Sequence, residues 1–133
     1  MKEKNNPWPR IFLSYAPEDM EYVHELNSAL VVIPDVQISS TDKLSAGENW
    51  LPKLKAELSS CDIFIVLVTP NSVESSWVLQ ELGAAWGLRK QIFAVYTDPR
   101  LISRLPVSLN QKQLVDIENI EKVEFVTSIL KAA

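Results

Sequence analysis

Short apolar runs alternate with segments of helical periodicity along most of this 133-residue chain, and this alternation constrains the fold more than any other feature. The longest run, Ile63–Val68, lies within a segment, residues 62–69, that has no alternation and is typical of a strand buried on both faces of a parallel sheet. Further strands are expected at residues 11–15, 36–38, 91–96 and 114–117. Alternation of strand and helix repeated about five times predicts an α/β fold with a central parallel sheet and helices on both faces.

Segments with the spacing of amphipathic helices separate and follow the expected strands. In the first, apolar residues recur at one-turn intervals from Tyr22 to Ile33. The second is expected to begin near residues 49–51, because Pro52 is tolerated only in a first turn. Residues 39–47 are predicted to form a loop, whereas residues 97–112 fit no pattern. The other predicted helices are residues 18–33, 76–90 and 119–130.

Composition favours one compact domain and excludes several other classes of protein. The net charge of −4 argues against a nucleic-acid surface. Cys61 is the only cysteine, which excludes a disulfide framework and a zinc site built from several cysteines. The longest apolar run is too short to cross a membrane, and the first residues lack the apolar core of a signal peptide. The expectation is a soluble, cytoplasmic single domain, residues 1–133, either complete or cut from a larger protein.

Several activities common among α/β proteins lack their motifs in this chain. No glycine-rich turn follows the first strand, and neither a phosphate-binding G-x-x-x-x-G-K-[ST] loop nor a G-x-S-x-G elbow occurs. His24, the only histidine, is expected on the surface of the first helix, away from the strand ends. We therefore expect no histidine-assisted catalysis, no metal site and no cofactor.

One carboxylate in the third helix is a candidate functional group. The neighbours of Glu81 one turn away include Trp77, Val78 and Ala85, none of which can pair with a carboxylate. Such a carboxylate marks a candidate site, although a position at the solvent edge of the helix is the simpler interpretation of the pattern. Trp77 shares a helix face with Glu81, where its indole could stack on a base or pyridine ring, or pack beneath the preceding loop. Trp86 is expected in the core.

Four motifs follow one another from the first strand to the third helix. They are P-R-I-F-L-S-Y-A-P-E-D, D-K-L-S-A-G-E-N-W, D-I-F-I-V-L-V-T-P-N-S and S-S-W-V-L-Q-E-L-G-A-A-W. In this order and spacing they resemble the motifs of Toll/interleukin-receptor (TIR) domains, especially those of the bacterial subgroup. The resemblance covers residues 9–97. It implies a flavodoxin-like, three-layer fold.

The resemblance also implies two classes of activity. Many bacterial, plant and some animal TIR domains cleave NAD⁺ at the nicotinamide–ribose bond, releasing nicotinamide and ADP-ribose or a cyclic isomer, whereas others act only as assembly modules. In the enzymatic class the catalytic glutamate falls on Glu81 and its paired tryptophan on Trp77. The remaining substrate-binding candidates are Ser14, Tyr15, Ala16, Ser40, Leu44, Asn49 and Trp50.

Cleavage of this bond is compatible with a single carboxylate. Ordinary glycosidases use two, because their alkoxide leaving group must be protonated. Nicotinamide leaves as a neutral molecule from a pyridinium cation, so one carboxylate that stabilises an oxocarbenium-like C1′, by charge or as nucleophile, is sufficient. We therefore expect an NAD⁺ glycohydrolase, with NAD⁺ as substrate, that acts as the effector of a bacterial defence or virulence system.

Self-association through the loop at residues 39–49 is expected to activate the enzyme, because in TIR relatives this loop docks on a neighbouring subunit. A sensor domain, fused or separate, is the expected source of the signal, and no nucleic acid or membrane partner is expected. The alternatives are a non-catalytic TIR interaction module and, more distantly, a nucleoside deoxyribosyltransferase. Two departures bear on NAD⁺ binding, since Ala16 and Pro17 replace arginines of some NAD⁺-cleaving relatives, and Ser40 replaces an acidic residue.

Overall fold

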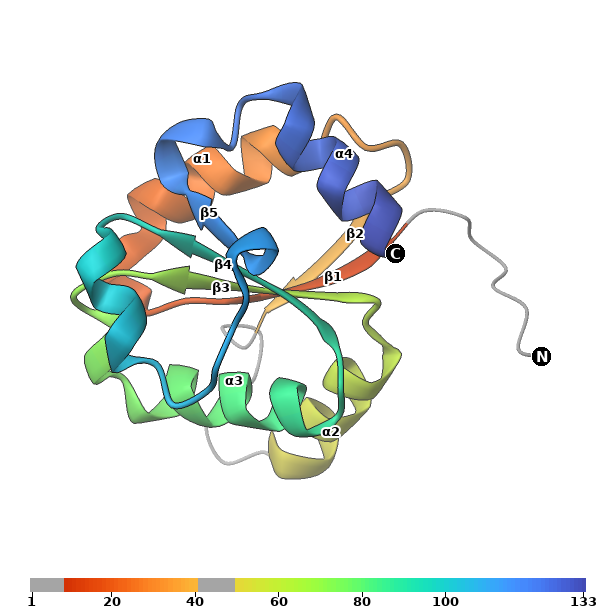
Figure 1. The fold of residues 1–133 in the computed structure, drawn as a ribbon. Helices are drawn as coiled ribbons and strands as arrows, with labels where there is room; N and C mark the ends of the chain where they lie inside the picture. The colour runs from red at the N-terminus through yellow and green to blue at the C-terminus, as the bar shows by residue number, and fades with distance from the viewer. Residues whose placement is uncertain (1–8, 41–49) are drawn as a thin grey trace.

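The computed structural model describes residues 9–40 and 50–133, except the side chains of residues 50 and 51. Within this part of the chain, five parallel strands form one sheet in the order β2-β1-β3-β4-β5 (Figure 1). The chain turns to one side of β1 to form β2 and then crosses to the other side to form β3, so the switch point lies between the carboxyl ends of β1 and β3. The strands are β1 Arg10–Ser14, β2 Gln37–Ser40, β3 Ile63–Val68, β4 Gln91–Tyr96 and β5 Leu114–Asp116.

Four α-helices of the described residues cover the sheet, two on each face (Figure 1). α1 (Met20–Leu30) and α4 (Val123–Ala132) pack on one face, whereas α2 (Trp50–Ser60) and α3 (Ser76–Gly87) pack on the other. The three-layer α/β fold predicted from the sequence is therefore confirmed.

Each face of the sheet has its own hydrophobic cluster, because successive residues of a strand point to opposite faces. β3 serves both clusters, since all six of its residues are buried. Towards α1 and α4 it contributes Ile63, Ile65 and Leu67, and towards α2 and α3 it contributes Phe64, Val66 and Val68. The two clusters are called the α1/α4 cluster and the α2/α3 cluster below.

The first helix is shorter than predicted at both ends, and the second strand extends further than predicted at its carboxyl end. A 3-10 helix, η1 (Pro17–Asp19), precedes α1, and the chain turns after α1 at Asp35, whose φ is 57°. β2 includes Ser39 and Ser40, although the sequence placed both in the loop at residues 39–47. These serines pair in parallel register with residues of β1, so strand pairing rather than local pattern extends β2.

The segment that fits no sequence pattern, residues 97–112, folds into short 3-10 helices and extended chain. η4 (Pro99–Arg104) follows β4, and η5 (Gln111–Gln113) leads into β5. Apolar side chains of this segment, including Leu101 and Ile102, pack on the α2/α3 cluster. The last helix begins at Val123 rather than Asn119, because η6 (Ile117–Asn119) and a turn come first.

Two single-residue expectations have opposite outcomes. His24 is exposed on α1, as predicted. The expectation that Trp86 lies in the core is wrong, because 54% of its surface is exposed. The buried stripe of α3 includes Leu82 and Ala85, and Trp86 lies about 100° further round the helix than Ala85, which places it outside that stripe.

Candidate active site

Glu81 lies against the carboxyl end of β1 and is fully buried, with 0% of its surface exposed. Its Oε1 accepts a hydrogen bond of 2.7 Å from the hydroxyl of Ser14, the last residue of β1. A buried carboxylate is costly unless hydrogen bonds replace those it made to water. The interpretation of Glu81 as a residue at the solvent edge of its helix is therefore wrong.

Local structure explains why these two side chains meet. The Ser75 side chain accepts a hydrogen bond from the backbone N–H of Val78 at 3.3 Å, and this N-cap sets where α3 begins. From that start, Val78 and Glu81 both lie on the buried face of α3. Ser14 is two residues after Phe12, so both point to the face of the sheet that α3 covers.

The structure does not bring all the other predicted site residues to the face of the sheet that carries Glu81. Trp77 is half-buried against the α2/α3 cluster, and Ser40 is half-buried at the end of β2. Tyr15 packs in the α1/α4 cluster on the opposite face of the sheet, so the structure does not bring its side chain beside Glu81. Ala16 is buried in the turn after β1. Leu44 and Asn49 lie outside the described residues, and of Trp50 only the backbone is described.

A second buried carboxylate at this end of the sheet, Asp19, was not found by sequence reasoning. It is 4% exposed, and its Oδ2 accepts a hydrogen bond of 2.5 Å from the hydroxyl of Thr69. Its Oδ1 accepts another, of 2.8 Å, from the side-chain amide of Asn71. The sequence does contain a signal for this contact. Asp19 follows the expected strand that ends at Tyr15, while Thr69 ends and Asn71 follows the next buried strand, and the carboxyl ends of parallel strands meet at one edge of the sheet.

The turn after β3 is also bonded internally. The backbone N–H of Thr69 donates to the hydroxyl of Ser72 at 2.8 Å, and the backbone N–H of Ser72 donates to the hydroxyl of Thr69 at 3.0 Å. The Ser72 hydroxyl donates in turn to the carbonyl of Thr69 at 3.3 Å. These bonds hold η3 (Ser72–Glu74), and hence the beginning of α3, close to the end of β3.

An exposed ion pair lies at the carboxyl end of the neighbouring strand β4. Arg100 donates to both carboxylate oxygens of Asp98, the shortest distance being 2.6 Å, and these hydrogen bonds lower the pKa of Asp98 to about 2. The Asp98 side chain also accepts from the backbone N–H of Arg100 and caps η4. Since exposed pairs add little stability, we assign this pair the local role of fixing where η4 begins.

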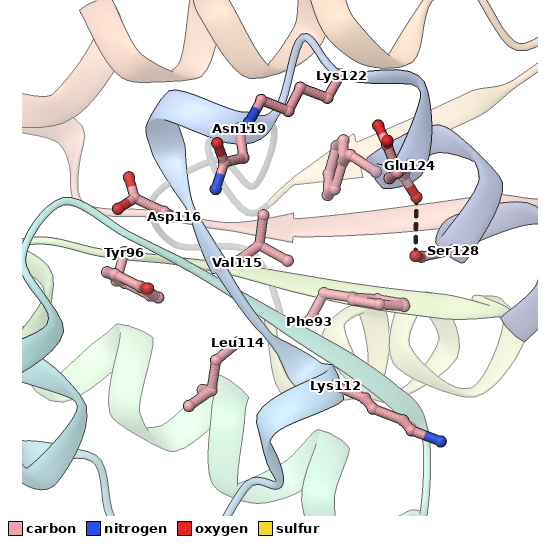
Figure 2. Close-up of a pocket in the computed structure, with 11 residues that line it drawn as sticks. Phe93, Tyr96, Lys112, Leu114, Val115, Asp116, Asn119, Lys122, Glu124 and Ser128 are labelled. Atoms are coloured by element: carbon pink, nitrogen blue, oxygen red, sulfur yellow. Dashed lines mark hydrogen bonds between the residues drawn. The ribbon is translucent and has the colours of Figure 1, made fainter.

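A cavity of about 410 Å³ lies at the β5 edge of the sheet, along β5 and the start of α4 (Figure 2). Its charged lining residues are of both signs, Lys112 and Lys122 against Asp116 and Glu124. Two strands separate β5 from β1, and none of the predicted site residues whose side chains the structure describes lines this cavity. It is therefore distinct from the candidate site around Glu81.

The described residues contain neither a metal-binding cluster nor a membrane-spanning helix. No group of three or more histidine, cysteine, aspartate or glutamate side chains in residues 9–40 and 50–133 is placed to hold a metal ion. In the same residues we find no helix with both the length and the apolar character needed to span a bilayer.

The family comparison gives the class of protein that this fold and these motifs define. The model of the TIR domain family matches residues 11–128, which is most of the chain. The chain therefore belongs to the TIR domain family, as its four motifs predicted. No curated protein sequence matches it.

Solved structures with the same fold include two TIR domains and one enzyme. The TIR domains of the activated Roq1 resistosome, which directly recognizes the pathogen effector XopQ, give a TM-score of 0.59 at 20% identity, over 93% of this chain and 80% of that chain. The TIR domain of the Toll-related receptor TRR-2 from Hydra magnipapillata gives 0.51 at 18% identity, over 76% and 74%. A 2-desoxiribosyltransferase from Leishmania mexicana gives 0.51 at 20% identity, over 68% and 65%. At these identities the likeness shows the fold alone.

Proposed function

We propose that this TIR domain is an NAD⁺ glycohydrolase in which Glu81 is the catalytic carboxylate. The observation that carries the proposal is the buried Glu81 carboxylate, bonded to Ser14 at 2.7 Å beside the carboxyl end of β1. Ligands of open α/β sheets bind outside the carboxyl ends of the strands at the switch point, which here lies between β1 and β3. Glu81 also occupies the glutamate position of the W-x-x-x-E pattern that begins at Trp77.

In the proposed reaction, water replaces nicotinamide at C1′ of the ribose. The bond between C1′ and the pyridinium nitrogen breaks, both electrons stay with that nitrogen, and nicotinamide leaves as a neutral molecule. A bond forms between C1′ and the oxygen of water, which releases one proton to the solvent, and the product is ADP-ribose. The negative charge of Glu81 stabilises the oxocarbenium-like C1′ during this exchange.

Ser14 has a supporting role in this proposal. Its hydroxyl donates to Oε1 of Glu81, which orients the carboxylate and offsets part of the cost of its burial. Trp77, half-buried one turn before Glu81, keeps part of its indole available to stack on the nicotinamide or adenine ring. In this proposal Ser14 orients Glu81 instead of binding the substrate, whereas Trp77 remains a substrate-binding residue.

Access to Glu81 requires a conformational change in this proposal. Because none of the Glu81 surface is exposed, the side chains around it must move before a nucleotide can reach the carboxylate. We propose that self-association of the domain favours the open conformation, consistent with an effector that remains inactive until it is assembled. One structural neighbour, the set of TIR domains in a resistosome described as activated, supports this form of regulation.

The substitution Glu81→Gln tests the catalytic assignment. Glutamine keeps the volume and can still accept the hydrogen bond from Ser14, but it carries no charge, so nicotinamide release is expected to fall at least about tenfold. The matched control is Glu25→Gln at an exposed position of α1, which is expected to keep full turnover. If Glu81→Gln keeps more than about a tenth of the wild-type rate, Glu81 does not supply the catalytic charge.

The substrate offered distinguishes the other two candidates. Purified protein is incubated in parallel with NAD⁺ and with a 2′-deoxynucleoside plus a free base, and both reactions are followed by chromatography. Nicotinamide release supports the proposal, whereas exchange of the base on the deoxynucleoside supports a deoxyribosyltransferase, to which one structural neighbour belongs. Release of neither product at any protein concentration supports a non-catalytic interaction module.

A further inference from the structure

Asp19 is a buried carboxylate that the proposed chemistry does not use. It occupies the N-cap position of α1, where an aspartate ordinarily accepts a hydrogen bond from the first turn of the helix. Its side chain makes no such bond here. Both of its oxygens instead accept hydrogen bonds from the turn after β3, from Thr69 and Asn71.

These two bonds connect segments that are distant in the sequence, since the partners lie 50 and 52 residues from Asp19. On one side, the backbone N–H of Asp19 donates to the carbonyl of Ala16 at 3.0 Å, in the turn that follows Ser14. On the other side, Thr69 and Asn71 lead through η3 to the beginning of α3. Asp19 therefore joins the two segments that carry Ser14 and Glu81.

We infer that Asp19 is a positioning residue for Glu81, because its carboxylate ties the turn after β1 to the turn after β3 and so maintains the contact between Ser14 and Glu81. The inference rests on the proposed function for the reaction it assists. The tie itself is a property of the fold, and amide hydrogen exchange measures it without any substrate.

The chemistry of the partners favours a carboxylate at this position. The hydroxyl of Thr69 already accepts a hydrogen bond from the backbone N–H of Ser72, so its own proton is directed to Asp19. The Asn71 amide offers a second donor, and an ionised carboxylate accepts both in bonds stronger than those to a neutral acceptor. A carboxylate at residue 71 would instead face that of Asp19 and repel it.

The direction of the Asp19–Asn71 bond provides the test. Asn71→Asp places two carboxylates in contact and is expected to break the tie. When Asp19→Asn is added, the amide nitrogen of residue 19 can donate to the carboxylate of residue 71, so the hydrogen bond forms again in the reverse direction. The amide oxygen of residue 19 still accepts from Thr69. The double variant is therefore expected to recover what the single variant loses.

Hydrogen exchange is measured first, on residues 15–20, 69–76 and 77–82. In Asn71→Asp all three segments are expected to exchange faster than in the wild type, and in the double variant they are expected to return to wild-type rates. If exchange in these segments is the same in all three proteins, Asp19 does not tie the two turns. This result is obtained whether or not the protein cleaves NAD⁺.

Kinetics of nicotinamide release follow on the same proteins. In Asn71→Asp, kcat is expected to fall by about tenfold or more because small displacements of a catalytic group are costly, while KM changes by less than about threefold. The control Ile129→Val, in the α1/α4 cluster, lowers the melting temperature without touching either turn and is expected to keep its kcat. If Asn71→Asp does not fold, Asn71→Ala removes one of the two bonds at an exposed side chain.

The outcomes separate the two proposals. A wild type that releases no nicotinamide at any protein concentration, with or without clustering, contradicts the proposed function, while hydrogen exchange still tests the tie. A wild type that is active, with faster exchange but unchanged kcat in Asn71→Asp or Asn71→Ala, shows that Asp19 is structural only and overturns the positioning role. Recovery of both exchange and kcat in the double variant supports that role.

Discussion

Glu81 and Asp19 are both buried carboxylates at the carboxyl end of the sheet, but their partners differ. Both oxygens of Asp19 accept hydrogen bonds from side chains of the turn after β3. Glu81 accepts a hydrogen bond from the hydroxyl of Ser14, and it lies on the buried face of α3 with Val78, Leu82 and Ala85. At the scale of single residues, we propose positioning for Asp19 because its bonds join two turns, and catalysis for Glu81 because it occupies the glutamate position of the W-x-x-x-E pattern.

Cys61 gives a prediction at the same scale. Burial of the side chain, which is 5% exposed, is the main cause that raises the pKa of the Cys61 thiol to about 11. The thiolate is the reactive form, so we expect native protein at pH 8 to resist iodoacetamide and urea-unfolded protein to react, as measured by mass spectrometry. Equal rates in the two states would contradict this expectation.

The same shift predicts how stability depends on pH. Between the ordinary thiol pKa of 9.0 and the folded value of about 11, the unfolded chain releases the proton of Cys61 and the folded chain keeps it. Because the folded state then binds more protons, this contribution to stability is complete below pH 9 and is lost as the pH rises to 11. Cys61→Ala removes the contribution and serves as the control.

At the scale of elements, a lysine side chain that follows α3 links the carboxyl ends of α2 and α3, which lie on the same face of the sheet. α3 ends at Gly87, and Arg89 adopts a left-handed φ of 59° beyond it. This turn directs Lys90 to α2, where its Nζ donates to the carbonyls of Ser59 at 2.8 Å and Cys61 at 3.0 Å. The sequence analysis placed Lys90 as the last residue of the third helix, whereas in the structure its side chain caps α2.

Lys90→Met tests this cap. The substitution keeps most of the aliphatic side chain but removes both hydrogen bonds, and because the group is partly exposed we expect a loss of about 1 kcal/mol. The melting temperature should then fall by about 3–5 °C. Lys55→Met, at an exposed position of α2, is the matched control and should change it by less than about 1 °C.

At the scale of the whole molecule, the burial of Glu81 and the expected self-association lead to one prediction. If the isolated domain populates mainly the closed conformation, its specific activity should be low when dilute and should rise when copies are brought together. We would measure specific activity over about a hundredfold range of protein concentration, with and without clustering on a scaffold. A constant specific activity under all these conditions would show that one chain holds the complete site.

The sequence by itself determined the layers of this protein. The uninterrupted apolar run of β3 requires cover on both faces, and the helical spacing of the neighbouring segments supplies that cover. Periodicity is a local property, so it can be read without knowing the fold. The family also followed from the sequence, because four motifs in order are specific where each alone is weak.

Only the tertiary structure decided which polar groups meet. Glu81 could have faced solvent, and its contact with Ser14 depends on how α3 lies on β1, across 67 residues of chain. Asp19 shows the same limit, because local pattern assigns an aspartate at a helix start to capping, whereas packing brings Thr69 and Asn71 to it. Ser39 and Ser40 join β2 because β1 lies beside them. Hydrogen bonds between distant segments form only when packing brings their atoms within about 3 Å, and no local pattern encodes that distance.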